Sequence, residues 1–564
     1  MNYLNIKEMN KYIKQIVNKL AVAVLLTGAL FIGSSCEDQL TEKPNNFYST
    51  EDFFQNTERL KMAVNGVYEV FSSQGTYGQY WMVYDCDTDI SFINGSGTGH
   101  VARDLGHYNV YTEHSWLQET WQFYYKGIDR ANTILENAHK VKLKDEIEDK
   151  ALFDQLIAEA RCLRAMSYFD LVLLFGDVPL KTTASKAQDN FKIARTDRNQ
   201  IFDLIVSDFE AAIPNLKYTA DQTGGYNGRL SKGAAMGLLA RVNLFRAGYF
   251  LAQDGTTKRY DNYLDYYQRV IDVTDELISS NKHSLLSSYE KLFKNMCELK
   301  SDPTENMWEI PFFNAIGEKL HSSNMGTYNG PTISDKSIYG RANSFIKTHN
   351  FFYDTYDATD LRKDVAVARF QIKADNTVSD YNTKSSINWA PGKWRRNWQT
   401  APVKDNNNTD VNWVLIRYAD VLLMRAEAEN EVNGVTAVAV EYLNKIRRRA
   451  HGFDYNTPVP TVDKQVSDFA DKDAFRNEIV DERARELCFE GMRRMDLIRW
   501  NLLGTKIAET NTKVLAAIAA NKLNAFIFTA AEKFIPNKHE LYPIPAYEIR
   551  ETNGIITQNP GYSN

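Results

Sequence analysis

The chain has 564 residues, of which 43% are hydrophobic and 24% charged, and its formal net charge is -6. This is the composition of a globular protein with ample material for a core, and it excludes a multi-span membrane protein, a collagen-like chain and a wholly disordered chain. The acidic balance gives no indication of a nucleic-acid partner. Aromatic residues make up 12% of the chain, a content that a large core would use and that a carbohydrate- or peptide-binding surface would also use.

The first 35 residues have the charge order of a secretory signal peptide. Four lysines precede the uncharged apolar segment 20–33, which is too short to span a ~30 Å hydrocarbon layer comfortably. The signal peptide is therefore predicted at 1–35, with translation starting at Met1 or Met9.

A small-residue segment, Gly33-Ser34-Ser35, stands directly before Cys36 and resembles a bacterial lipobox. This predicts that Cys36 is the lipidated first residue of the mature protein and that residues 36–46 form a polar tether. Two or three acyl chains, at ~0.8 kcal/mol for each buried CH₂, would hold a folded domain on a bilayer. The alternative is cleavage by ordinary signal peptidase, which would leave Cys36 as a free thiol.

The other four cysteines are widely and irregularly spaced, and they are Cys86, Cys162, Cys297 and Cys488. Two of them fall in helical apolar patterns, where cysteine behaves as a small hydrophobic residue. We therefore expect no structural disulfide. No CxxC or Cys/His spacing indicates a zinc site.

Helical periodicity dominates the first half of the mature chain. Apolar residues recur at helical intervals over 117–139, 151–175 and 197–213. Gly176 followed by Pro179 predicts the end of the second helix, and Thr196 or Asp197 predicts the N-cap of the third.

Two pairs of helices are predicted further along. The first pair covers 231–248, capped by Ser231, and 263–278; the second covers 417–432 and 435–450. Helix hairpins of this length packed side by side resemble tetratricopeptide units, although the strict consensus is absent. The Arg- and Glu-rich segment 478–490 provides neighbours of opposite charge along one helix, worth ~0.2–0.5 kcal/mol a pair.

Two regions have a different texture. Residues 76–115 and 300–412 are rich in Asn, Ser, Thr, Gly, Tyr and Trp and contain few helical patterns. A short strand is predicted over 306–313. Because binding residues usually lie on loops held by a rigid scaffold, we interpret the helices as the frame and these two regions as the functional part.

Six ordered segments resemble the SusD/RagB family of outer-membrane lipoproteins, and the resemblance covers essentially the whole mature chain. The segments are AEARCLRAMSYFDLVLLFGDVPL (158–180), TDRNQIFDLIVSDFEAAIPNL (196–216), GRLSKGAAMGLLARVNLF (228–245), WVLIRYADVLLMRAEAENE (413–431), ERARELCFEGMRRMDLIRW (482–500) and YPIPAYEIRETNGIITQNPGY (542–562).

The resemblance implies a mostly α fold, in which tetratricopeptide-like helical hairpins carry an irregular, loop-rich ligand-binding portion. It divides the mature chain into a helical region at 47–300 and a loop-rich, then helical region at 301–564. It implies a surface protein, anchored in the outer membrane, that captures a nutrient and acts as the lid of a SusC-like TonB-dependent transporter. The implied ligand is an oligosaccharide, with a peptide as the alternative.

One candidate binding set lies in the first irregular region. Asp85, Asp87 and Asp89 alternate like the opening of an EF-hand, but Ile90 and Ser96 occupy the positions that need Gly and Glu, so calcium is not expected. Aromatic rings beside carboxylates and arginine suit a sugar, which offers an apolar face and a rim of hydroxyls. The predicted ligand-binding residues here are Trp81, Tyr84, Asp87 and Arg103. The alternative is a polar loop with Trp81 buried.

The second irregular region supplies further candidates. Trp389 and Trp394 lie among basic residues, and Trp389 is expected to form an exposed platform. Tyr328 is another candidate, whereas Trp308, in an apolar run, is expected to be packed. We expect the two irregular regions to meet in space on one face of the frame.

Catalysis has no support in the sequence. No HExxH, GxSxG or P-loop motif is present, and the nine histidines are scattered. No cofactor or metal is predicted. The chain is predicted to bind without turnover, with a surface glycan hydrolase and a pure protein scaffold as the alternatives.

Overall fold

A computed structural model of the protein describes residues 6–32, 53–145, 147–222, 228–314, 321–400 and 407–563. These residues belong to two units, Met1–Phe54 and Gln55–Asn564. The first unit contains α1 (Ile6–Ile32), which covers most of the predicted signal peptide. Cys36 and the predicted tether at 36–46 lie outside the described residues.

Within the described ranges, no helix is both long and apolar enough to cross a membrane.

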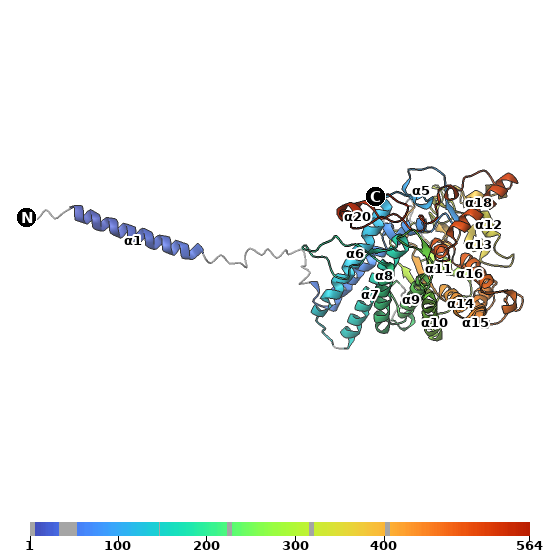
Figure 1. Cartoon of the computed structure of the whole chain (residues 1–564), viewed down its shortest axis with the longest axis horizontal. Coiled ribbons are helices and arrows are strands. Elements are labelled where there is room, and N and C mark those ends of the chain that lie inside the picture. Colours follow the sequence, from blue (N-terminus) through green and yellow to red (C-terminus); the bar gives the residue numbers. More distant parts are fainter. Residues whose placement is uncertain are drawn as a thin grey trace, which may run out of the picture. The chain divides into compact units, whose positions relative to one another are not determined.

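The frame of the second unit is a row of helices that follow the order of the sequence. Neighbours pack in succession, from α6 on α7 through α8, α9 and α10 to α14, which packs on α15 and α16. Figure 1 shows this row running from α6 and α7 to α14 and α15. Its members are α3 (Thr57–Phe71), α6 (Ser115–Asn137), α7 (Glu148–Phe175), α8 (Arg198–Ala212), α9 (Lys232–Arg246), α10 (Tyr263–Ser279), α14 (Tyr418–Asn433), α15 (Ala437–Ala450) and α16 (Lys472–Leu487).

The predicted helices are confirmed, with ends that follow the predicted caps. The Asp197 side chain accepts from the backbone N–H of Asn199 at the start of α8. The Ser231 side chain accepts from that of Ala234 at the start of α9. Gly176 ends α7 with φ at 74°, a left-handed conformation that favours glycine. The two predicted helix pairs are α9 with α10 and α14 with α15, and they lie side by side because α10 packs on α14.

The rest of the unit consists of short helices, turns and two-stranded antiparallel pairs. The pairs are β1 (Ser91–Ile93) with β7 (Ile346–Thr348), β2 (Val178–Pro179) with β3 (Arg195–Thr196), β4 (Phe250–Leu251) with β5 (Thr257–Lys258), β6 (Asn306–Ile310) with β12 (Trp413–Arg417), β8 (Val367–Ala368) with β11 (Ala390–Pro391), and β9 (Phe370–Ile372) with β10 (Val378–Asp380). The short helices are α4 (Tyr80–Tyr84), α5 (Val101–Gly106), α11 (Tyr289–Cys297), α12 (Asn350–Tyr353), α13 (Lys363–Ala366), α17 (Arg493–Arg499), α19 (Thr529–Lys533) and α20 (Ala546–Glu551), with the longer α18 (Leu503–Ala519) among them.

The pair β6–β12 ties the second irregular region to the frame. Every residue of both strands is buried, and both strands contact α9. The predicted strand at 306–313 is confirmed as β6, which ends before Pro311 because proline has no N–H to donate to the ladder. β12 leads directly into α14, so the irregular region starts and ends on the frame.

Buried ion pairs join β12, α15 and α16. The Arg417 guanidinium lies 2.8 Å from Glu305, 3.0 Å from Glu486 and 2.8 Å from Glu490. Arg449 lies 3.1 Å from Glu305 and 2.5 Å from Glu486. All five side chains have at most 8% of their surface exposed. The charges of segment 478–490 therefore bind distant elements, in addition to the neighbours that the sequence predicts.

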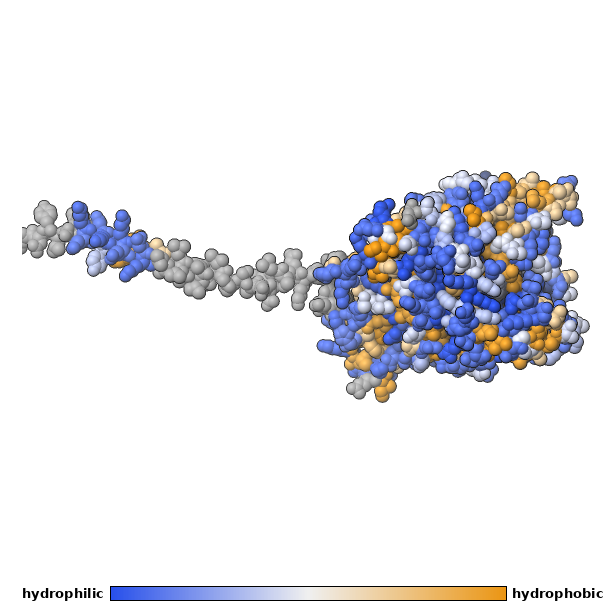
Figure 2. All heavy atoms as spheres, in the orientation of Figure 1, coloured by the Kyte–Doolittle hydropathy of each residue, from blue (hydrophilic) through white to orange (hydrophobic). Residues whose placement is uncertain are grey.

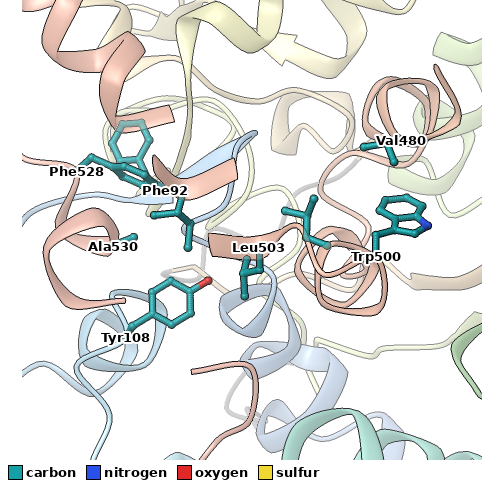
Figure 3. Packing of buried hydrophobic residues seen from close by; sticks show 9 residues of the cluster. Phe92, Tyr108, Val480, Trp500, Leu503, Phe528 and Ala530 are labelled. Atoms are coloured by element: carbon teal, nitrogen blue, oxygen red, sulfur yellow. The ribbon is translucent and has the colours of Figure 1, made fainter. Parts of the chain in front are cut away.

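A cluster of buried hydrophobic residues packs the first irregular region against the C-terminal helices. Figure 3 shows Phe92 of β1 and Tyr108 beside Phe528, Ala530 and Leu503. This cluster fixes β1, and with it the loop that follows, on the body of the protein. Figure 2 shows polar residues spread between apolar ones over the face that it displays, as the mixed composition predicts.

Candidate ligand-binding site

The two irregular regions meet where β1 pairs with β7. Phe92 lies opposite Lys347, and the Asn94 N–H donates to the Phe345 carbonyl at 2.9 Å. The prediction that regions 76–115 and 300–412 come together is confirmed at this pair. The candidate site is built around its open end.

An exposed polar loop, residues 94–100 (NGSGTGH), leaves β1 at this point. Two side chains of α5 hold it. The Arg103 Nε donates to the Asn94 carbonyl at 2.7 Å, and the Asp104 carboxylate accepts from the Gly99 N–H at 3.0 Å. The loop therefore presents glycine backbone and small polar side chains in a fixed position.

A third support comes from a buried histidine–aspartate pair. The His107 Nδ1 lies 2.5 Å from the Asp87 carboxylate, and its Nε2 donates to the Gly95 carbonyl at 2.7 Å. Burial lowers the pKa of His107, but Asp87 and the Gly95 carbonyl outweigh this effect, so the net pKa lies above its usual value. The other Asp87 oxygen accepts from the Ile93 N–H at 2.7 Å. Asp87 is fully buried and positions the loop rather than facing a ligand.

Two aromatic rings lie beside this loop. Tyr328 and Phe345 are half-buried, with ring centroids 5.4 Å apart. The Arg103 guanidinium lies 5.5 Å from the Phe345 centroid, and the exposed His100 ring lies at the same distance. The Tyr328 hydroxyl forms a hydrogen bond with the Gln79 side chain, and burial raises the pKa of Tyr328. Arg103 and Tyr328 were both predicted as ligand-binding residues, and in the structure both lie against Phe345.

A second ring pair follows Gln79 in the chain. Tyr80 and Trp116 stack with centroids 3.8 Å apart and planes 10° apart. The Tyr80 hydroxyl donates to Glu119 at 2.6 Å, and burial, followed by Glu119, raises the pKa of Tyr80. Tyr80 is buried and Trp116 half-buried, so Trp116 is the member of this pair that a ligand could contact.

The prediction that Trp81 is an exposed platform is wrong. Trp81 has 1% of its surface exposed, stacks on Tyr77 at 4.9 Å and donates from Nε1 to the Gly491 carbonyl at 3.0 Å. Tyr84 is also 1% exposed, and its hydroxyl forms a 2.7 Å hydrogen bond with Thr120. Both belong to α4, a one-turn helix buried on every side, and they pack rather than face solvent.

The exposed platform predicted at Trp389 is wrong as well, and Trp394, the other predicted ligand-binding tryptophan of this region, is also buried. Trp394 is 1% exposed and packs edge-on against Phe293 at 5.5 Å. Trp389 is 8% exposed and packs edge-on against Tyr353, also at 5.5 Å. Both rings therefore pack against other aromatic side chains instead of facing solvent. Trp308 is fully buried, as predicted.

The sequence interpretation did not single out four residues of this site, which are Gln79, His100, Trp116 and Phe345. The signal that could have found the first ring pair is the glycine-rich segment NGSGTGH, which marks exposed backbone in an aromatic-rich region. Trp116 stands between the irregular region 76–115 and the predicted helix 117–139, and the structure places it in the first turn of α6.

The acidic run 85–89 is bound entirely by protein groups. Asp85 accepts from the N–H groups of Gly491 and Arg494, and Asp89 pairs with Arg493 at 2.6 Å. Among the described residues, no group of three or more His, Cys, Asp or Glu side chains could hold a metal ion. The four cysteines of this part of the chain are buried and unpaired.

A cavity of ≈ 420 Å³ borders the loop. Asn94, Gly95 and Ser96 line it, together with the apolar side chains Phe526 and Ile527. This volume lies within the about 300–1,000 Å³ that is usual for ligand sites. The first residues of the loop therefore face a space of ligand size.

Two family models match the chain. One, described as "SusD family", matches residues 350–562, and another, described as "Starch-binding associating with outer membrane", matches residues 38–244. The chain belongs to the SusD/RagB family.

Similar proteins of this family cover nearly the whole chain. A SusD-like protein of Formosa agariphila is 28% identical over 86% of this chain and 90% of its own length. The starch-binding protein SusD of Bacteroides thetaiotaomicron is 23% identical over 98% and 99%. A crystal structure of a SusD homolog from Bacteroides thetaiotaomicron is 29% identical, covers 91% of this chain and 98% of its own, and has a TM-score of 0.81. The mostly α, SusD-like fold predicted from the sequence is confirmed.

Proposed function

We propose that the protein is a cell-surface glycan-binding protein that captures an oligosaccharide and delivers it to a SusC-like TonB-dependent transporter. The observation that carries the proposal is the half-buried ring pair Tyr328–Phe345 beside the exposed loop 94–100. The family description "Starch-binding associating with outer membrane" supports it. The name of the relative SusD, a starch-binding protein, also supports it.

The chemistry of this site suits a sugar. Each sugar ring offers an apolar C–H face and a rim of hydroxyls, so its binding needs an aromatic surface with a few convergent polar groups. Phe345 and Tyr328 supply the aromatic surface, and Trp116 supplies a further ring. Arg103, Gln79 and the loop backbone supply donors and acceptors. Because the loop is already held by α5 and His107, little ordering is needed on binding.

The proposed location is the outer membrane surface, through a lipid on Cys36. The lipobox-like sequence and the family description support it. Cys36→Ala should release the protein from washed outer membranes while its helical content stays unchanged. Retention of this variant in membranes that lack the transporter would contradict the lipid anchor.

The test of glycan capture is a polysaccharide and peptide array probed with the mature protein, followed by titration calorimetry on the best ligand. Phe345→Ala should weaken binding strongly. Phe191→Ala is the matched control, because Phe191 is 55% exposed and also carries a cation, Lys181, over its ring at 5.0 Å. Binding of peptides alone, or equal effects of the two substitutions, would overturn the proposal.

The proposed role involves no turnover of the ligand. The ligand should be recovered intact after long incubation with the purified protein, as judged by chromatography of the oligosaccharides. Cleavage that survives purification and is abolished by a single substitution at the site would favour a hydrolase instead.

A further inference from the structure

The candidate site contains cations that form no ion pair with any residue in the described ranges of the chain. Arg103 makes one hydrogen bond, from Nε to the Asn94 carbonyl. Across the described part of the chain, no carboxylate lies within 4.0 Å of its guanidinium, and its terminal nitrogens have no acceptor. Most buried arginines, by contrast, are paired, as Arg417 and Arg449 are.

Arg103 is nevertheless held in place. Phe345 lies under its guanidinium, with its centroid 5.5 Å away. On another side, a Cβ at Gly95 would come within 2.9 Å of Nε and 3.1 Å of Nη2, so only glycine leaves room for the guanidinium there. The φ of +87° at Gly95 favours glycine as well. The terminal N–H groups are thus fixed in position without being used.

Two further cations, Arg341 and Lys347, lie within four residues of Phe345 in the chain. Lys347, two residues after Phe345, has 3% of its surface exposed, and its Nζ donates to the Ser344 hydroxyl at 2.8 Å. Burial lowers the pKa of Lys347 to about 8, with no carboxylate to oppose the effect. Arg341 is exposed and lies close enough to Tyr328 for its charge to lower the pKa of that phenol, against the larger effect of burial. Neither cation forms an ion pair with any residue that the structure describes.

The acids on the neighbouring elements are already engaged. Asp87 is bound to His107, and Asp104 accepts from the Gly99 N–H and from Asn109 at 2.8 Å. Glu119 accepts the Tyr80 hydroxyl. These hydrogen bonds orient the three carboxylates toward other groups, and none of the three forms an ion pair with Arg103, Arg341 or Lys347.

We infer that the glycan bound at this site is anionic, and that Arg103 receives its sulfate ester or uronate carboxylate. This rests on the proposed function, and it names the ligand class within it. A guanidinium offers a planar pair of donors that matches both groups, in a bidentate geometry. A neutral sugar would cover the arginine without supplying a negative charge, which costs desolvation free energy. The site thus discriminates in favour of the acidic polymer.

The first test uses inorganic sulfate and does not depend on any glycan. Protein labelled with [¹⁵N]arginine is titrated with sodium sulfate against sodium chloride at constant ionic strength, and the Arg103 Nε–H signal is assigned by its loss in Arg103→Met. We expect a saturable shift of this signal. The control is Arg259, an arginine that stacks on Tyr263 at 3.4 Å away from the site and should not shift. An Arg103 signal that stays unchanged would overturn the inference.

The second test uses an array of matched polysaccharides, in which each acidic polymer stands beside its desulfated or carboxyl-reduced counterpart. The acidic member should be preferred, and the two chemical treatments show whether sulfate or carboxylate is the group bound. Arg103→Met should weaken binding of the acidic member by about 10- to 100-fold, the usual worth of hydrogen bonds to a charged group. It should also flatten the dependence on salt. Arg259→Met should leave both unchanged.

The two tests separate the inference from the proposed function. Equal binding of acidic and neutral members would overturn the inference while glycan capture stands. A saturable sulfate shift without binding of any polysaccharide would overturn glycan capture while the anion site at Arg103 stands.

Discussion

Two regions of the molecule differ in whether their positively charged side chains form ion pairs. Around β12, α15 and α16, Arg417, Arg449 and Arg362 are fully buried, and each lies within 3.1 Å of at least two carboxylates. At the candidate site, Arg103 and Lys347 are held just as firmly but face no carboxylate that the structure describes. Burying a charge without a partner is costly. The first region therefore carries its own counter-ions, whereas the second is the region at which we infer an anionic ligand.

The titration behaviour of the two regions follows the same division. Burial alone would raise the pKa of Glu486, but Arg449 and Arg417 lower it to about 2. Burial alone would lower the pKa of Arg417, but the carboxylates of Glu490, Glu486 and Glu305 keep it well above its usual value. At Lys347, burial acts without opposition and lowers the pKa to about 8.

The largest expected effect comes from breaking the balanced region. Glu486→Gln leaves Arg417 and Arg449 short of negative charge in the core, and breaking one partner out of a buried pair costs about 3–5 kcal/mol. Denaturant unfolding should show this loss. The control is Glu210→Gln, in a surface pair with Arg269 in which both side chains are 44% exposed, where about 1 kcal/mol or less is expected. Equal losses for the two variants would mean that the network adds no more than a surface pair.

Two aromatic substitutions, one of a buried ring in α4 and one of a half-buried ring at the candidate site, distinguish packing from binding. Trp81→Ala removes a side chain that is 1% exposed and should cost about 3–5 kcal/mol of unfolding free energy. Phe345→Ala, at the site, should cost about 1 kcal/mol or less. Its main effect should appear in ligand titration. A stable Trp81→Ala protein that has lost binding would reverse the assignment of these two rings.

The buried carboxyl of Asp170 in α7 forms no ion pair with a described residue, so it tests how burial alone changes the pKa of a carboxyl and the stability of the fold. Asp170 accepts the Tyr77 hydroxyl at 2.9 Å, and burial raises its pKa to about 7. Because the folded state holds this proton more tightly than the unfolded state, the contribution is complete below about pH 4 and is lost as the pH rises through 7.

Asp170→Asn should remove that loss. The variant should be more stable than the natural protein at pH 8, by at most about 4 kcal/mol, and should keep only about a third of this advantage at pH 5. Urea unfolding at the two pH values measures the difference. A variant that is equally destabilised at both would show that the carboxyl stays ionised in the folded protein.

The smallest expected effect concerns the loop of the candidate site. The Gly95 carbonyl and the Asp87 carboxylate both accept hydrogen bonds from His107, so both of its ring nitrogens donate, as in an imidazolium. Its raised pKa means that this support is present at low pH and is lost as the pH rises through the folded value. Asp87 opposes deprotonation and Arg103 promotes it.

Ligand affinity should therefore fall severalfold between pH 6 and pH 9, and His107→Gln should remove the part of this fall that is due to the loop, leaving the part due to Lys347, whose pKa is about 8. Hydrogen exchange of the loop amides should rise over the same interval, which separates a change in the loop from a change in the ligand. Unchanged exchange at residues 94–99 would show that His107 does not control the loop.

The sequence predicted the frame well because helices leave local marks. Apolar residues at helical spacing gave the positions of α6, α7 and α8, and Asp197 and Ser231 gave the start of α8 and α9. These signals act within a few residues of each other, so no distant contact is needed to interpret them. The six family-like segments add to this, because they lie mostly on such helices.

The candidate site was only partly predictable, for a physical reason. In the irregular regions, successive side chains follow no fixed period, so the sequence does not tell which ring faces the core. Trp81 and Phe345 both stand in aromatic, polar surroundings, yet Trp81 donates to the Gly491 carbonyl and is buried, whereas Phe345, which directly precedes β7, is half-buried. Arg103 was predicted as a ligand residue, but only the fold shows that none of the described carboxylates forms an ion pair with it.

The amino-acid sequence by itself thus determined the helices, their caps, the family, and the two regions in which binding residues are expected. Tertiary structure alone decided which arginines are neutralised and which aromatic rings remain accessible. Both properties depend on contacts between residues hundreds of positions apart, such as Trp81 with Gly491 or Phe92 with Lys347. Local periodicity carries no information about such contacts, because burial and charge pairing are properties of the packed chain.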